Sequence, residues 1–132
     1  MEKIIVQIGW CDNYCAASDE ILGCVACSDT IEGIKKEYRS ALDFHIKGML
    51  EDGDELPEKL KNEYELVFEL DTSAMLHSLD GIVTRKAIAK VTGINEALLT
   101  HYANGFRKPR PVQRQRIIDG IHQIGRELTL IE

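Results

Sequence analysis

The sequence predicts an α+β protein made of two small modules, a β-β-β-α-β domain over residues 1–71 and an all-α domain over residues 72–132. Two observations support this division. Strand-like segments dominate before residue 71, and helical periodicity dominates after it. Residues 1–71 hold 7 Lys+Arg against 17 Asp+Glu, a net charge of −10, whereas residues 72–132 hold 9 against 5, a net charge of +4. Such an asymmetry indicates two modules with different partners.

Three short strands are expected at the start of the first module. Lys3–Trp10 is rich in β-branched residues, and Tyr14–Ser18 follows the turn residues Asp12-Asn13. A connection over Asp19–Gly23 then leads to a third strand at Cys24–Ser28. Strands of these lengths suit an antiparallel meander.

A helix and a fourth strand complete the first module. Apolar residues recur at helical spacing over Ile31–Met49, with Asp29 or Thr30 as the N-cap. Tyr64–Leu70 alternates as a strand, and a crossover helix permits it to lie parallel to a neighbour. Since one helix covers one face of the sheet, we expect the other face to need a partner subunit or a bound protein.

Four helices are expected in the second module, and turn residues separate them. Their expected bounds are Thr72 or Ser73 to Leu79, Arg85–Thr92 capped by Thr84, Glu96–Asn104 capped by Asn95, and Val112–Leu130.

The two middle helices have the spacing of a helix-turn-helix. Ala89-x-x-x-Gly93 followed by Leu99 supplies a small residue at the crossing, a turn glycine and an apolar plug. Both caps, the Gly105 stop and a basic tail accompany this spacing, so Thr84–Pro111 resembles the Cro/repressor-like helix-turn-helix family. The alternative is an αα-hairpin used only for packing.

If this module binds DNA, the helix that begins after Asn95 is the recognition helix. Its outward residues would meet base edges, and basic residues around it would hold phosphates. Glu96 either contacts cytosine or caps the helix, and His101 either donates to the DNA or is an ordinary surface residue. The candidates for base contacts are Glu96, Ala97, Thr100 and His101. The candidates for phosphate contacts are Arg85, Lys86, Asn104, Arg107, Lys108 and Arg110.

The first module resembles the N-terminal domain of the HicB antitoxin family. The matching stretch is "DNYCAASDEILGCVACSDTIEGIKKEYRSALDFHIKGMLEDGDELP", with Tyr14, Gly23-Cys24, Asp29-Thr30 and the acidic segment Asp52–Pro57 at the family's characteristic places. The resemblance implies a partial RNase H-like fold. "AIAKVTGINEALLTHYANGFRKPRPVQRQRIIDGIHQIGREL" is similar to the members that end in a helix-turn-helix.

This resemblance implies a non-enzymatic antitoxin with two partners. One is a small basic HicA-like toxin that cleaves mRNA, and the other is operator DNA, through which the protein represses its own operon. Asp12, Asp19 and Glu20 are our candidates for toxin contacts, and a homodimer or tetramer is expected. The alternative is a stand-alone helix-turn-helix repressor whose first module dimerises or senses a ligand.

The sequence favours neither a metal-dependent nuclease site nor a zinc site. An RNase H-like nuclease needs converging carboxylates, and Glu2, Asp12, Glu69 and Asp71 stand at strand ends with nothing to gather them. The four cysteines either bind zinc or are buried small residues; Cys24 and Cys27 would point to opposite faces of a strand, which favours the second. We expect no cofactor, no metal, no membrane span and a cytoplasmic protein with reduced cysteines.

Overall fold

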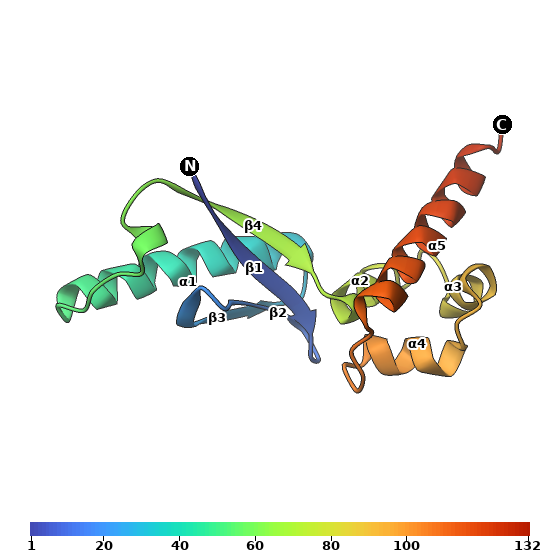
Figure 1. Ribbon diagram of the computed structural model, residues 1–132, viewed down its shortest axis with the longest axis horizontal. Coiled ribbons are helices and arrows are strands. Elements are labelled where there is room, and N and C mark those ends of the chain that lie inside the picture. Colours follow the sequence, from blue (N-terminus) through green and yellow to red (C-terminus); the bar gives the residue numbers. More distant parts are fainter. The chain divides into compact units, whose positions relative to one another are not determined.

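The structure is a computed structural model that describes all residues from Met1 to Glu132. It is mixed α+β, with a four-stranded sheet and five α-helices (Figure 1). The chain divides into two compact units, Met1–Asp71 (the N-terminal unit) and Thr72–Glu132 (the C-terminal unit). None of the helices combines the length and the apolar character needed to cross a membrane.

The sheet belongs to the N-terminal unit and has the strand order β3-β2-β1-β4. β1 pairs antiparallel with β2, and β2 pairs antiparallel with β3. β4 lies parallel to β1, in a register that runs from Glu2 opposite Tyr64 to Ile8 opposite Leu70. The sequence-based expectation of a meander followed by a parallel strand is therefore correct. The strands are β1 (Glu2–Trp10), β2 (Tyr14–Ser18), β3 (Ile21–Ser28) and β4 (Tyr64–Leu70).

The long helix α1 (Ile31–Glu51) covers one face of the sheet (Figure 1). Its residues Ile34, Tyr38 and Leu42 are buried, and the Tyr38 ring meets the Phe68 ring of β4 edge-on, with centroids 6.2 Å apart. Thr30 is the N-cap, because its hydroxyl accepts a hydrogen bond from the Gly33 amide at 2.9 Å. The open choice between Asp29 and Thr30 is thus decided.

The third strand begins earlier than the sequence predicted. β3 starts at Ile21, not at Cys24, so that only Asp19 and Glu20 form the turn between β2 and β3. The pairing shifts register between Ala17 and Ser18, and Gly23 within the strand has a φ of +83°. This irregularity breaks the period-two alternation on which the prediction depended. A short 3₁₀ turn, η1 (Glu58–Leu60), was also not anticipated.

The C-terminal unit is entirely helical and has its own core. Its helices are α2 (Thr72–Ser78), α3 (Arg85–Thr92), α4 (Glu96–Ala103) and α5 (Pro111–Thr129). The buried residues come from all four helices and from the α3–α4 turn, namely Leu76, Ile88, Ile94, Leu99, Tyr102, Ala103 and Ile117. Gly120 lets α5 pack closely on α3, since a β-carbon at this position would overlap the Thr92 side chain.

Candidate nucleic-acid interface

Caps and one left-handed residue set the geometry of α3 and α4. The Thr84 hydroxyl accepts a hydrogen bond from the Ala87 amide at 3.0 Å, and the Asn95 side chain accepts one from the Ala97 amide at 2.8 Å. Gly93 has a φ of 74°, a conformation that glycine adopts without strain, and its amide donates to the Ala89 carbonyl at 2.8 Å. The chain therefore leaves α3 and enters α4 through a short, well-defined turn.

Apolar packing holds this helix pair in place. Leu99 of α4 is completely buried among the residues of the C-terminal core, including Ile88 of α3 and Ile117 of α5. Arg116 of α5 donates to the Thr92 carbonyl at 2.6 Å, at the end of α3, and Arg114 donates to the Thr72 hydroxyl at 3.0 Å. Both arginines therefore form hydrogen bonds within the C-terminal unit.

The residues proposed for base contacts share one side of α4. Glu96, Ala97 and His101 are exposed and Thr100 is half-buried, whereas Leu99, Tyr102 and Ala103 face the core. The capping hydrogen bond comes from Asn95, which leaves Glu96 in the first helical turn with its side chain exposed. The helix dipole favours a carboxylate at the N-terminal end of a helix, so a role in DNA binding is not needed to explain Glu96 at this position.

Glu96 and Thr100 also line a hollow between the start of α3 and α4. Its volume is about 570 Å³, and Asp80, Thr84 and Arg85 contribute to its wall. Two carboxylates, Asp80 and Glu96, line this hollow, so it suits a hydrogen-bond donor such as the exocyclic amine of a base rather than a phosphate.

The residues proposed for phosphate contacts fall into two groups. Lys86, Asn104, Arg107, Lys108 and Arg110 are exposed. Arg85 differs from them, because its side chain is only 22% exposed and pairs with Asp80 at 3.5 Å, with its Nε buried. An arginine held in this way is less available to a phosphate than its exposed neighbours.

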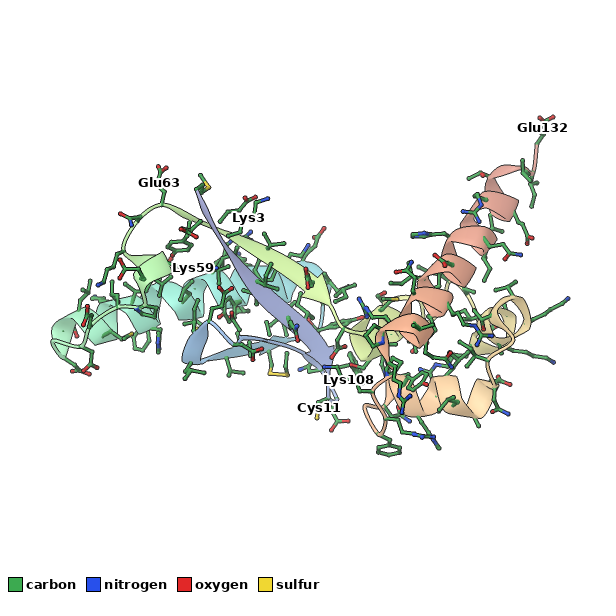
Figure 2. The ribbon with its side chains drawn as sticks, in the orientation of Figure 1. Lys3, Cys11, Lys59, Glu63, Lys108 and Glu132 are labelled. Carbon is green, nitrogen blue, oxygen red and sulfur yellow. A yellow bond between two sulfur atoms is a disulfide. The ribbon has the colours of Figure 1, made fainter.

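Three of the exposed cations lie together after α4. Arg107, Lys108 and Arg110 line a hollow of about 430 Å³ that also involves Tyr102 of α4. Lys108 is labelled in Figure 2 on the loop between α4 and α5. A hollow lined by three cations is suited to a phosphate group.

Sequence reasoning missed Phe106, which precedes this basic segment. Its side chain is 76% exposed, and its ring lies 6.0 Å from that of His101, centroid to centroid. An aromatic residue interleaved with cations is a recognisable signal for contact with nucleotides. The sequence-based candidates in this segment were the cations Arg107, Lys108 and Arg110, and Phe106 was not among them.

The candidates for toxin contacts are not brought together. Asp12 lies in the β1–β2 turn, where it has a φ of 60°, whereas Asp19 and Glu20 form the β2–β3 turn at the other end of β2. Glu20 accepts a hydrogen bond from the Ile5 amide at 2.9 Å and forms an ion pair with Lys59. The hydrogen bond from Lys59, followed by that from Ile5, holds the pKa of Glu20 below its ordinary value.

Two of the four cysteines form a disulfide, so the expectation that all four are reduced is wrong. Cys15 of β2 and Cys27 of β3 are register partners and are bonded to each other. Cys11 is free and exposed at the β1–β2 turn (Figure 2), and Cys24 is free and buried. No three or more His, Cys, Asp or Glu side chains gather in a geometry that could hold a metal ion. Cross-strand register is a long-range property, which explains why spacing alone did not indicate this pair.

Comparison with known proteins adds one relative of unknown role. No protein-family model matches the chain. The chain is 27% identical over 108 residues, which is 80% of each chain, to an uncharacterized 14.9 kDa protein from the rep–hol intergenic region of Haemophilus phage HP1.

Proposed function

We propose that this protein is an antitoxin with two separate binding surfaces. Its C-terminal unit binds operator DNA and represses transcription, and its N-terminal unit binds and neutralises a small basic toxin that cleaves mRNA. The protein itself carries out no catalysis in this scheme. The observation that carries the proposal is the two-sided α4 of the C-terminal unit, which buries Leu99 and Tyr102 while Glu96 and His101 face outward beside an exposed basic loop.

The arrangement of α3 and α4 supports a helix-turn-helix. A short α3 capped by Thr84, a left-handed Gly93 and an α4 capped by Asn95 are the parts that such a motif requires. In this scheme α4 enters the major groove, where Glu96 can accept from cytosine and Ala97 can touch a thymine methyl. The exposed Lys86, together with the basic loop, then contacts the phosphates on either side.

The N-terminal unit supports the other half of the proposal. Its β-β-β-α-β order, with β4 parallel to β1, is compatible with the partial RNase H-like fold that the resemblance to HicB implies. The net charge of −10 over residues 1–71 complements a basic toxin, and complementary charge speeds the encounter of two proteins. The +4 over residues 72–132 suits DNA, so the opposite charges of the two units fit two different partners.

Two measurements test the proposal together. The purified chain should bind the DNA upstream of its own gene with higher affinity than DNA of unrelated sequence, and a homodimer or tetramer should be the bound form. It should also co-purify with the product of a neighbouring reading frame that encodes a short basic protein, and should relieve that protein's toxicity. Specific DNA binding without such a partner would favour a stand-alone repressor, and absence of both would refute the proposal.

A further inference from the structure

A groove lies in the N-terminal unit between α1 and β3, the edge strand of the sheet. Its volume is about 470 Å³. Gly23 and Cys24 of β3 contribute to one side, Phe44 and Gly48 of α1 to the other, and Asp52 and Asp54 lie at the end of the helix. β3 has no strand beyond it, so the backbone groups on its outer edge have no partner strand.

Two glycines line this groove and place no side chain in it. A β-carbon at Gly48 would meet no atom within 4 Å, and one at Gly23 would have only the His45 Cε1 atom nearby, at 3.5 Å. Gly48 lies inside α1, where glycine costs about 0.5–1 kcal/mol relative to alanine. No packing contact within the chain explains a glycine at position 48. Its effect is a stretch of α1 with no side chain facing the groove, called the bare wall below.

An exposed aromatic ring borders the groove. The Phe44 side chain is 79% exposed although it belongs to the helix that carries the core of this unit. Burying such a side chain against a partner contributes about 1.5–3 kcal/mol. The groove therefore offers an apolar contact that the chain itself does not use.

Two carboxylates lie at the end of the groove, at the C-terminal end of α1, where negative charge is unfavourable. Asp52 caps the C-terminus of α1 and Asp54 follows it, and the last turn of the helix holds no basic residue. The C-terminal end of a helix carries partial negative charge, so carboxylates there raise the energy of the free protein. Neither aspartate forms an ion pair, whereas nearby Glu55 pairs with Lys61 at 2.8 Å. A bound cation would offset this repulsion.

We propose that this groove binds a basic, partly apolar segment of a partner protein. An apolar side chain of that segment lies against Phe44 and the bare wall at Gly48, and an adjacent Lys or Arg pairs with Asp52 and Asp54. The N-terminal unit of a second copy would bring a net charge of −10 to an acidic site, so a basic partner is the better occupant. The proposal rests on the proposed antitoxin function only in naming this partner as the basic toxin.

The direct test uses a short fluorescent peptide of alternating Leu and Lys as the probe, with a Ser–Lys peptide of equal charge as its control. Fluorescence anisotropy at near-physiological salt measures binding to the full-length chain. The Leu–Lys peptide should bind more tightly than the Ser–Lys peptide. Equal binding of the two would mean that only bulk charge attracts them, and would overturn the proposal, as would no binding of the Leu–Lys peptide.

Three sets of variants locate the site. Gly48→Leu should fill the groove and weaken binding at least about tenfold, while removing a helix glycine and so preserving the fold. Phe44→Ser should weaken binding by a similar factor, whereas Leu50→Ser, which removes another exposed apolar residue of α1 outside the groove, should change it less than about twofold. Asp52→Asn with Asp54→Asn should weaken binding, and the matched double change Glu37→Gln with Asp43→Asn should not. Equal losses in test and control variants would overturn the proposal.

Failure of this site is distinguishable from failure of the proposed function. If the Gly48→Leu variant still neutralises the toxin and binds operator DNA, the groove is not the toxin site and the antitoxin function stands. If the wild-type chain binds the Leu–Lys peptide with the expected variant pattern but no toxin partner, the groove stands and the antitoxin function fails.

Discussion

Removal of two loop cations provides the sharpest test of the DNA-binding surface. Lys86, Arg107, Lys108 and Arg110 are exposed, and none of them forms an ion pair within the chain. We expect the double change Arg107→Ala with Lys108→Ala to weaken operator binding and to flatten its dependence on salt. Both side chains are exposed, so the fold of the C-terminal unit should be unaffected.

The number of available cations sets the size of the effect. Each phosphate contact contributes about −0.9 to the slope of log affinity against log salt concentration, so two bound copies with four cations each give a slope of about −7. Raising the salt from about 50 to about 200 mM should then weaken wild-type binding about 20,000-fold. The double variant keeps about half of these contacts, and the same change in salt should weaken its binding only about 150-fold.

Fluorescence anisotropy of a labelled operator fragment across a salt series measures this slope. The matched control is Lys90→Ala with Arg126→Ala, which removes the same charge from two other exposed positions of the C-terminal unit. The control should retain the wild-type slope. If both double variants flatten the slope equally, the whole basic unit attracts DNA without a defined surface, and the assignment of the loop is wrong.

Three further predictions concern stability. Leu99→Ala should destabilise the C-terminal unit by about 2–5 kcal/mol, measured by urea unfolding followed by helical circular dichroism. Trp10 lies in β1, so its fluorescence reports unfolding of the N-terminal unit. An equal shift of the Trp10 transition would show that the two units unfold together. Glu20→Gln should reduce the loss of folding stability at acid pH. The lysine partner holds the pKa of Glu20 below its ordinary value of 4.5, so the ionised carboxylate stabilises the folded state above pH 4.5, and this stabilisation is lost as the pH falls and the carboxylate is protonated. If urea unfolding across a pH series shows the same loss of stability in the variant and the wild type, the prediction is wrong. Tyr38→Phe should lower the free energy of unfolding by less than about 1 kcal/mol. Burial raises the pKa of the Tyr38 hydroxyl, and the only partner of this hydroxyl is the weakly hydrogen-bonding Cys24 thiol. A larger loss of stability in thermal unfolding would show that the contact with Cys24 is important.

Local signals in the sequence predicted most of the secondary structure. Tyr64–Leu70 alternates cleanly and became β4 with the same bounds, and Thr84 and Asn95 cap their helices as polar residues before apolar runs should. The crossover through α1 permitted a parallel β4, and the structure has β4 parallel to β1. The start of β3 was missed, because the bulge near Ser18 and the unusual backbone at Gly23 interrupt the alternation that marks a strand.

Long-range pairing explains what sequence reasoning could not supply for the candidate site. The bond between Cys15 and Cys27 depends on the register of two strands, and the ion pair that engages Arg85 depends on where the chain places Asp80. Arg116 likewise crosses from α5 to the end of α3, 24 residues away in the sequence. Residue type and spacing indicated where cations gather, whereas only the folded chain distinguishes the cations that bond internally from the exposed ones.

The parallel pairing of β1 with β4 has a consequence for synthesis of the protein. β1 lies inside the sheet, yet one of its two neighbours is the last strand of the unit, about fifty residues later. At roughly 5–20 residues per second, a ribosome leaves that edge of β1 without its neighbour for about 3–10 s. During this interval the apolar strand can pair with another chain, so the nascent N-terminal half should depend on chaperones, and any product truncated before Tyr64 should aggregate.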